Sequence, residues 1–461
     1  MHPAFSFEQF LRGLPHRYRL PELAGDGDAL ASMSSEGNRF SARLAMILEQ
    51  ARRALAVGDT PGRELEQAFI AAMAGMIQEA AQDDGGDPVF QAMVLEHHEP
   101  VVSEYTALAR HFQPDRRRVQ GLINAIAHPE KLKRQPPGPL RNALAQLRNS
   151  AAAAHWPSLP TALQQALSAP AAGEDSDLAS ALTQLLAEPA LQRLVRLDTL
   201  RGHKRVQQYL ALREQQGPRA NSEAAARQGA EGRRRGMGVE TLAAQALQAL
   251  ALRLDRMSNG ATRHQVVTSM HVPASLSAGH QGAKTEWDVV LLKQVAETAR
   301  PMPVFDVCLL LEAKASPDAV GTDLPRLLRG LRLLAAAQPG ETHVFKAREG
   351  EFPVRGASLN ALPTEAARLA GTVLYCSDAP ADPQPRLLSA SSRMKLLSAP
   401  ESLAFATALR QQGAAEPRWL EPLWQQLLSA PEWKVVLFQT FAMQQARELM
   451  VHADDLLAGA A

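Results

Sequence analysis

The stretch LLLEAKAS, residues 309–316, ends an apolar run with two opposite charges, Glu312 and Lys314. In a β-strand, alternate side chains point to the same face, so this carboxylate and this ammonium would lie side by side. The same alternation places Asp306 and Cys308 on their face of the strand. The pattern therefore predicts a charged cluster where the strand ends.

The preceding strand-like run, KTEWDVVLLKQ at residues 284–294, carries acids at alternate positions. Glu286 and Asp288 would share one face and Trp287 the other. If the two strands pair, Asp288 comes to lie beside Glu312. Two carboxylates that converge at a half-buried point repel each other, and a divalent cation relieves that repulsion. Hard oxygen ligands suit Mg²⁺ or Mn²⁺, so we expect a site for one of these ions.

A third acid stands on a predicted helix, GVETLAAQALQALALRLD, at residues 238–255. Glu240 is in register with the apolar stripe that would face the sheet, formed by Ala243, Ala244, Leu247, Leu250, Ala251 and Leu254. It is either a further member of the acidic site or a carboxylate that interacts with the positive end of the helix dipole.

A second Glu-x-Lys sequence, Glu432-Trp433-Lys434, serves as a comparison. Its surroundings, LSAPEWKVVLFQ at residues 428–439, predict a helix. Side chains two positions apart on a helix diverge by roughly 200° around the axis. These two charges therefore cannot meet at one point, and only the pair at 312 and 314 is a candidate site.

The elements that must position these residues form a mixed sheet with helices. Helix, three strands, helix, strand, loop and strand are expected in that order. Their ranges are 238–255, 263–273, 284–294, 304–316, 322–338, 342–347 and 371–378, with a turn at 297–303 between the second and third strands.

The chain has 461 residues, more than one hydrophobic core usually serves. We expect an α/β core at residues 237–380, flanked by an all-α region at 1–213 and a helical region at 381–461. Residues 214–236 are polar and contain several glycines, which predicts a linker or a mobile basic loop.

Composition predicts an ordinary cytoplasmic protein without a membrane partner. No run approaches the roughly 18 apolar residues of a membrane span, and the first residues lack a signal-peptide pattern. Cys308 and Cys376 lie in apolar runs and are expected to be buried, reduced thiols. The net charge of +1 conceals two basic segments, 110–148 and 193–235, which hold 9 and 11 Lys/Arg against 2 and 4 Asp/Glu. Such segments are either solvated helix faces or nucleic-acid contacts.

A helix acid, a strand Asp and a strand Glu-x-Lys on an αβββαβ unit resemble the PD-(D/E)XK nuclease superfamily, whose fold is restriction-endonuclease-like. The resemblance covers about residues 238–378. It implies that Asp288 and Glu312 bind metal, with the Ala313 carbonyl as a further ligand. It also implies that Lys314 orients or polarises the attacking water, and that Glu240 acts in the outer shell or on a second metal.

The sequence departs from the family pattern in three places, the first of which is the long interval of 24 residues from Asp288 to Glu312. Trp287 stands where the family name has proline, and the Gln-x-x-x-Tyr motif of the exonuclease branch is missing from residues 322–338. The resemblance therefore implies an endonuclease rather than a processive exonuclease. Two groups of arginines are either solvated or in contact with phosphate: Arg326, Arg329 and Arg332 on the second helix, and Arg233, Arg234 and Arg235 just before Glu240.

These features predict a metal-dependent nuclease that hydrolyses phosphodiester bonds in DNA. The helical regions would bind substrate, a partner protein or a second copy of the chain. Two other interpretations stay open. The protein could bind nucleic acid, or act as a scaffold, with a nuclease-like fold and no catalysis. It could also be a helical interaction protein in which Glu312 and Lys314 form a surface pair of little energetic weight.

Overall fold

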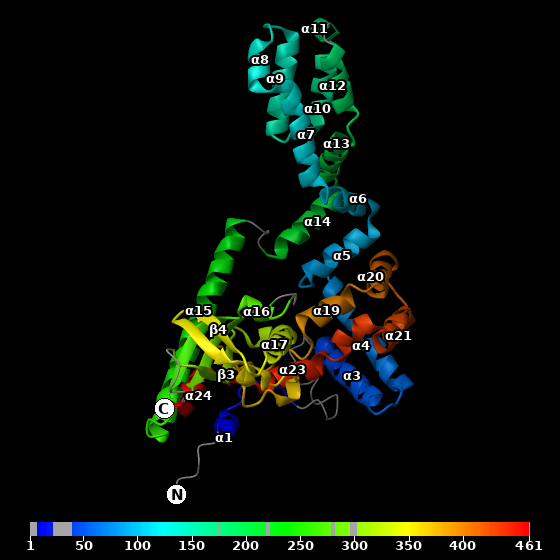
Figure 1. Cartoon of the computed structure of the whole chain (residues 1–461). Coiled ribbons are helices and arrows are strands. Elements are labelled where there is room, and N and C mark those ends of the chain that lie inside the picture. Colours follow the sequence, from blue (N-terminus) through cyan, green and yellow to red (C-terminus); the bar gives the residue numbers. More distant parts are fainter. Residues whose placement is uncertain are drawn as a thin grey trace. The chain divides into compact units, whose positions relative to one another are not determined.

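The structure is a computed structural model that describes residues 7–21, 39–173, 176–217, 222–277, 282–295 and 302–460 (Figure 1). The chain divides into two compact units. The first consists of residues 1–77, 219–402 and 416–461, and the second of residues 78–218 and 403–415.

This division corrects the expected domain boundaries. Residues 1–213 do not form one helical region, because the first 77 residues group with the sheet. Most of residues 381–461 also belong to the sheet unit. The reason is shared burial: Leu11 and Leu14, near the start of the chain, pack in the same cluster as Leu456, near its end.

The first unit contains the following helices: α1 (Phe7–Arg12), α3 (Arg39–Ala56), α4 (Arg63–Ala81, which continues into the second unit), α15 (Glu223–Met257), α16 (Ala274–Ser277), η3 (Pro317–Ala319), α17 (Val320–Ala335), α18 (Gly356–Asn360), η4 (Ala366–Arg368), α19 (Ala390–Leu397), α20 (Pro400–Gln412, which continues into the second unit), η5 (Pro417–Leu420), α21 (Glu421–Ser429), η6 (Pro431–Trp433), α22 (Lys434–Leu437), α23 (Gln439–Glu448) and α24 (Ala453–Ala460).

The second unit is helical where it is described. Its helices are α5 (Pro88–His98), α6 (Pro100–Ala109), α7 (Phe112–Ala127), α8 (Pro129–Arg134), α9 (Pro139–Ala152), η2 (Trp156–Ser158), α10 (Leu159–Leu167), α11 (Pro170–Gly173), α12 (Ser176–Leu186), α13 (Pro189–Arg201) and α14 (Lys204–Gln215). Helices α7 to α13 surround one apolar core, which includes Leu144, Leu147 and Leu163 (Figure 1).

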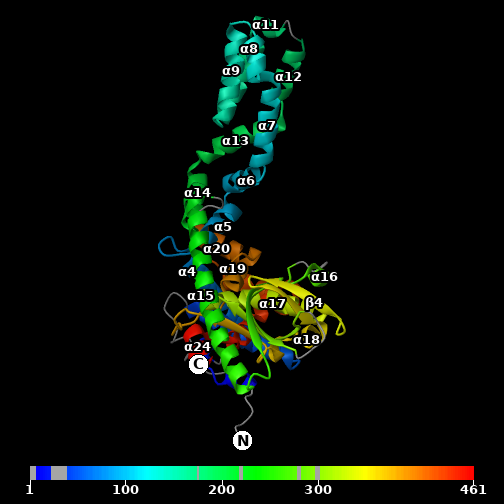
Figure 2. The ribbon, with the colours of Figure 1, turned by 60° about the vertical axis from the view of Figure 1, so that its left-hand side comes forward.

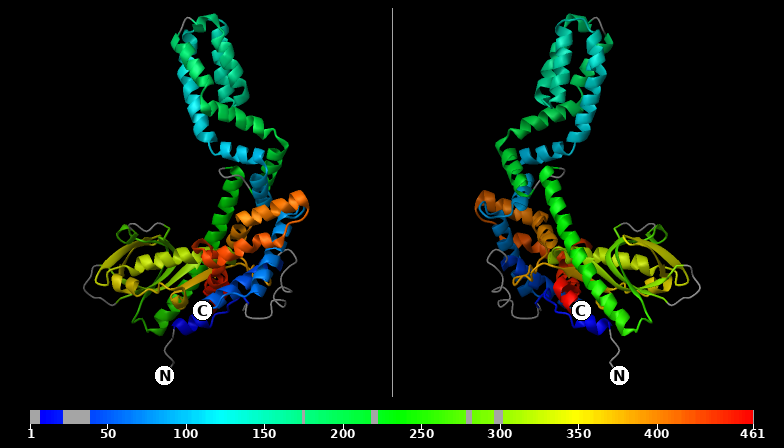
Figure 3. Two further views of the ribbon diagram at one scale, coloured as in Figure 1. Left: turned by 90° about the vertical axis from the view of Figure 1, so that its right-hand side faces the viewer. Right: turned by 90° about the vertical axis from the view of Figure 1, so that its left-hand side faces the viewer.

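Helix α15 corrects the predicted linker at 214–236. Residues 223–236 form its first half, and the Ser222 hydroxyl accepts a hydrogen bond from the Ala225 N–H at its start. Alanine, arginine and glutamate favour helix enough to outweigh the scattered glycines. The second half of α15 is held by packing along the strands (Figures 2 and 3). Residues 218–221 of the predicted linker, and 297–301 of the predicted turn, lie outside the described residues.

The sheet has seven strands in the order β2-β1-β4-β5-β3-β6-β7, and β2 also pairs with β3. Because β2 pairs with both β1 and β3, strands β1 to β5 form a closed barrel. The strands are β1 (His264–His271), β2 (Glu286–Gln294), β3 (Phe305–Ala313), β4 (Thr342–Ala347), β5 (Gly350–Arg355), β6 (Val373–Ser377) and β7 (Met450–His452).

The mixed α/β sheet expected from the sequence is confirmed, with antiparallel pairing of β1, β2 and β3 and parallel pairing of β3, β6 and β7. Strands β5 and β7 were not expected. The barrel is closed by short contacts: β1 meets β4 at His271 and Lys346, and β3 meets β5 at Phe305 and Val354.

Helices α15 and α17 bury opposite faces of the sheet. On one face, Leu247 and Leu250 of α15 pack with Leu311 and with Cys376 of β6. On the other, α17 supplies an apolar row that packs with the strands. The row consists of Val320, Leu324, Leu327, Leu331, Leu333 and Leu334.

The predicted alternation along β3 is wrong in its first half. Phe305, Val307 and Leu310 pack on the α17 face, whereas Cys308 packs on the α15 face. The cause is an irregularity in the β2–β3 pairing, where Leu291 and Leu292 pair with residues two positions apart on β3. Asp306 and Cys308 therefore do not share a face with Glu312. Asp306 instead accepts hydrogen bonds from Arg355.

A second irregularity lies next to Asp288. Trp287 and Val290 both pack in the α17-side cluster although they are three residues apart, so Trp287 is not on the face predicted for it. On the neighbouring strand β1, Ser269 has φ 49°. This left-handed conformation interrupts the regular pairing of β1 with β2. Asp288 therefore stands at a distorted point of the sheet.

Both cysteines are free thiols, as expected. Cys376 is buried and Cys308 is partly exposed. Burial raises the pKa of Cys308 to about 11 and the pKa of Cys376 to about 12. Since the thiolate is the nucleophile, neither side chain has the character of a reactive cysteine.

A buried carboxylate in α3 yields a prediction about stability. Glu49 accepts hydrogen bonds from Arg52 at 2.7 and 2.8 Å and from Arg53 at 2.8 Å. Burial acts to raise the pKa of Glu49, but the two guanidinium groups outweigh it and lower the pKa below its ordinary value. A lowered carboxyl pKa stabilises the fold above the pKa of the unfolded chain, and this contribution disappears as pH falls through the folded value.

We expect Glu49→Gln to lower the free energy of unfolding by about 2 kcal/mol at neutral pH, and by less in acid. Urea denaturation at both pH values measures this, with the exposed Glu64→Gln as control. A loss that does not change with pH would contradict it.

Candidate active site

The site is built around Glu312, which is buried at the end of β3. Val289 pairs with Leu311, so Asp288 and Glu312 are the next residues along the two antiparallel strands. The Asp288 Oδ2 atom accepts a hydrogen bond from the Ala313 N–H at 2.9 Å. The structure therefore brings Asp288 beside Glu312, on strands held together by backbone pairing.

Lys314 joins this pair of acids. Its Nζ atom lies 3.3 Å from Glu312 Oε2 and 3.2 Å from Asp323 Oδ2. Its backbone N–H donates to the Cys376 carbonyl at 2.8 Å, which fixes the residue against β6. Burial acts to lower the pKa of Lys314, but Glu312, Asp323 and Asp288 together raise it above its ordinary value. The ammonium therefore stays charged although it is mostly buried.

Glu312 is in the opposite electrostatic situation. Burial, followed by repulsion from Asp288, raises the pKa of Glu312, while Lys284 and Lys314 act to lower it. Its Oε1 atom is buried and has no hydrogen-bond partner. An unsatisfied carboxylate oxygen in the interior is costly, so this atom is a free acceptor for a cation or a proton.

Glu240 approaches the same region from α15. Its Oε1 atom lies 3.8 Å from Arg348 Nη2 in the turn between β4 and β5, and it has no hydrogen-bond partner. Burial, followed by repulsion from Asp288, raises the pKa of Glu240. Of the two roles predicted for Glu240, membership of the acidic site is the one that agrees with repulsion from Asp288. Glu240 stands inside α15 and not at its first turn.

The arginines proposed for nucleic-acid binding are exposed. Arg235 donates to the Ala315 carbonyl at 3.4 Å, next to Lys314, so it lies at the edge of the site. Arg233 and Arg234 precede it on α15. On α17, Arg329 donates to the Gly282 carbonyl at 2.9 Å. Arg326 and Arg332 complete the exposed row on that helix.

The two basic segments, 110–148 and 193–235, both combine exposed basic side chains with ion pairs. In the first, Arg117, Lys131 and Arg134 are exposed on α7 and α8. In the second, Arg193 forms an ion pair with Asp115 and Arg196 forms one with Glu104. Arg118 and Lys133 of the first segment likewise pair with Glu188 and Glu130, so acids offset part of the charge of both segments.

Three residues of the site were not predicted from the sequence: Lys284, Asp323 and Tyr375. The Lys284 Nζ atom lies 2.5 Å from Glu312 Oε2 and 3.5 Å from Asp288 Oδ1. The Tyr375 hydroxyl donates to Asp323 Oδ2 at 3.2 Å. Lys284 could have been suspected because it begins the run that leads into Asp288. The other two carry no local signal, because only folding brings α17 and β6 to Lys314.

The donor chemistry suits a hard cation, but a complete set of ligands is not in place. Within the described residues, no three His, Cys, Asp or Glu side chains are grouped closely enough to hold a metal ion. Asp288 and Glu312 face the ammonium groups of Lys284 and Lys314 instead. The Oε1 atoms of Glu312 and Glu240 are buried and accept no hydrogen bond, so a Mg²⁺ or Mn²⁺ ion could use them.

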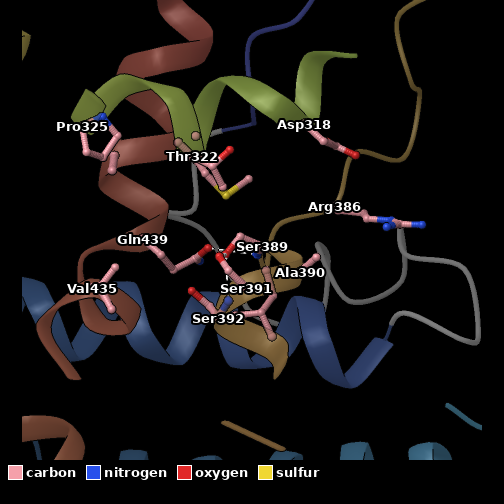
Figure 4. Close-up of a pocket in the computed structure, with 14 residues that line it drawn as sticks. Asp318, Thr322, Pro325, Arg386, Ser389, Ala390, Ser391, Ser392, Val435 and Gln439 are labelled. Atoms are coloured by element: carbon pink, nitrogen blue, oxygen red, sulfur yellow. Dashed lines mark hydrogen bonds between the residues drawn. The ribbon is translucent and has the colours of Figure 1, made fainter. Parts of the chain in front are cut away.

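A separate cavity of about 190 Å³ lies between α17, the start of α19 and α23 (Figure 4). Thr322, Ser389 and Gln439 are among the residues that line it, and Asp318 at its rim forms an ion pair with Arg447. None of the converging acids and lysines around Glu312 contributes to its wall. The arrangement of charges, and not this cavity, identifies the candidate site.

Comparisons with known proteins add no assignment. No protein-family profile, no curated protein and no solved structure matches the chain. Among the helices of the described residues, none combines the length and apolar character needed to cross a bilayer.

Proposed function

We propose that this site hydrolyses phosphodiester bonds in DNA with the help of Mg²⁺ or Mn²⁺. The observation that carries the proposal is the convergence of Asp288, Glu312 and Lys314, with a buried Glu312 oxygen that has no partner. Asp288 comes from β2, and Glu312 and Lys314 come from the end of β3. Such a concentration of buried charge is costly, which favours a functional role.

Each residue has a role that follows from its chemistry. Asp288 and Glu312 would hold the ion, with the Ala313 carbonyl beside them and Glu240 further out. When bound, the ion lowers the pKa of water and stabilises negative charge on phosphate oxygens. Lys314 supplies a fixed positive charge, and Asp323 and Tyr375 hold it in place. Preorganised charge of this kind stabilises a transition state without further reorganisation.

The arginines near the site fit an anionic polymer. Arg235 lies next to the segment that carries Lys314, while Arg326 and Arg329 are exposed on α17. Lys and Arg contacts to phosphate supply most of the affinity for DNA independent of sequence. A cytoplasmic location, and contact with a second copy or a partner protein through helical regions, remain predictions from the sequence.

The order of elements supports the finer part of the proposal, a restriction-endonuclease-like core. Helix α15, strands β1 to β3, helix α17 and strand β6 follow one another as an αβββαβ unit. In this interpretation the β4–β5 hairpin is an addition between α17 and β6, and it is this hairpin that closes the barrel.

The test is cleavage of DNA with and without divalent metal. We expect the protein to cleave or nick at least one DNA form among closed circular, linear duplex and single-stranded substrates in Mg²⁺ or Mn²⁺. A chelator should abolish cleavage, and added metal should restore it. Cleavage that persists in the chelator, or no cleavage of any form by a folded and DNA-binding protein, would contradict the proposal.

A non-catalytic DNA-binding protein is the second candidate. It is favoured by the ammonium of Lys284 between the two strand acids and by the incomplete ligand set. Such a protein would retain DNA equally well in chelator and in metal, and Asp288→Ala would leave that retention unchanged.

A further inference from the structure

The side chain of Lys284 is an internal cation of the acidic site. Its ammonium contacts both strand acids, at 2.5 Å from Glu312 Oε2 and 3.5 Å from Asp288 Oδ1. Only 5% of the side chain is exposed. A buried lysine is tolerated where carboxylates surround it, because an unpaired buried charge is strongly destabilising.

The backbone of Lys284 is fixed by helix α17. Its N–H donates to the Arg326 carbonyl at 3.3 Å. At Gly330, a Cβ atom would lie 2.8 Å from the Lys284 carbonyl oxygen and 2.8 Å from its Cβ. The helix can approach this closely only because residue 330 is glycine. The ammonium is therefore directed at the acids by a rigid support, and only the flexible part of the side chain is free to rotate.

The two lysines of the site differ in their partners. Lys314 contacts Asp323 as well as Glu312, so it keeps a carboxylate if Glu312 binds another cation. The carboxylates that Lys284 contacts are the two proposed metal ligands. A divalent ion and the Lys284 ammonium would therefore compete for the same oxygens.

We propose that Lys284 occupies the cation position of the site and must move out before a divalent ion binds. This inference rests on the proposed function, since it assumes that Asp288 and Glu312 are metal ligands. Without metal, the ammonium neutralises the acids and stabilises the fold. Metal loading is then an exchange of one cation for another, which lowers the apparent affinity for the ion.

The main test is calorimetric titration of Mn²⁺ into the whole protein at mildly alkaline pH, where free carboxyl groups are ionised. Lys284→Met should bind Mn²⁺ at least about tenfold more tightly than wild type, because no ammonium has to be displaced. Lys293→Met, an exposed lysine on β2, is the matched control and should bind as wild type does. Equal or weaker binding by Lys284→Met would overturn the inference.

A second measurement covers the case in which Lys284→Met does not fold. Amine labelling of the wild-type protein, followed by mass spectrometry, reports how accessible each lysine is. Lys284 should be protected without metal and should become at least about tenfold more reactive in saturating Mn²⁺, while Lys293 stays unchanged. Protection of Lys284 that persists in metal-bound protein would overturn the exchange.

These outcomes separate the inference from the proposed function. Wild-type protein that cleaves DNA in metal, with no gain in affinity in Lys284→Met, refutes the inference alone. Tight binding by Lys284→Met beside no binding and no cleavage by wild type supports the inference and refutes the function. Absence of binding in both proteins, with no cleavage, refutes both.

Discussion

Replacing Lys314 by alanine should reduce the rate of metal-dependent DNA cleavage by about 100- to 1000-fold. The ammonium lies between Glu312 and Asp323, and these acids hold it in its charged form. Removing a fixed charge beside a reacting phosphate costs transition-state stabilisation that water cannot replace in a buried site. Single-turnover cleavage at saturating protein measures the chemical step without the contribution of product release.

The fold should survive this substitution. Glu312 keeps Lys284 as a partner, and Asp323 keeps the hydrogen bond from Tyr375. Lys434→Ala is a matched control, because it belongs to the other Glu-x-Lys sequence, which starts a helical segment and has an exposed lysine. Cleavage by Lys314→Ala at the wild-type rate, with the control also unaffected, would exclude Lys314 from the chemistry.

Replacing Glu312 by glutamine should weaken Mn²⁺ binding by about 100-fold or more. The amide keeps the size of the carboxylate but removes the negative charge and one acceptor. Glu312 contributes the buried oxygen that has no partner, and it also contacts Lys284 and Lys314. Calorimetric titration of the variant against wild type measures the change directly.

The same substitution should also destabilise the metal-free protein. Lys284 would keep only Asp288, at 3.5 Å, and Lys314 only Asp323 among the acids that contact it. At a pH above the raised pKa of Glu312, where its carboxylate pairs with the lysines, breaking this buried pair costs about 3 kcal/mol in the free energy of unfolding. Glu432→Gln, in the comparison sequence, should change neither stability nor metal binding. Wild-type affinity in a folded Glu312→Gln protein would show that the ion, if any, binds elsewhere.

The elements of the α/β core could be predicted from local pattern. The apolar runs that became β1, β2, β3, β4 and β6 were recognised because strand periodicity and turn residues are local properties. Strand β5 contains two charged residues, a proline and a glycine, and β7 has only three residues, so neither shows a strand pattern. The first half of α15 cannot be predicted locally, because its glycines and charges are typical of a loop. It is helical as the extension of the second half, which packs on the sheet.

The position of Asp288 beside Glu312 also followed from the sequence. Antiparallel pairing of neighbouring strands is the simplest connection, and the acids stand where that pairing brings them together. The sequence did not predict correctly to which face of the sheet Asp306, Cys308 and Trp287 point. A bulge depends on how two strands fit each other, and a sequence read one strand at a time does not contain that fit.

The residue types that could do chemistry can be read from the sequence: two strand acids, a helix acid and a lysine at the end of an apolar strand. Their neighbours depend on how the elements pack. Lys284 and Asp323 become neighbours of Glu312 and Lys314 because α17 packs across the sheet and, at Gly330, comes close to the Lys284 backbone. Such contacts join residues from different elements, and their energy depends on distance and burial that exist only once the core has formed.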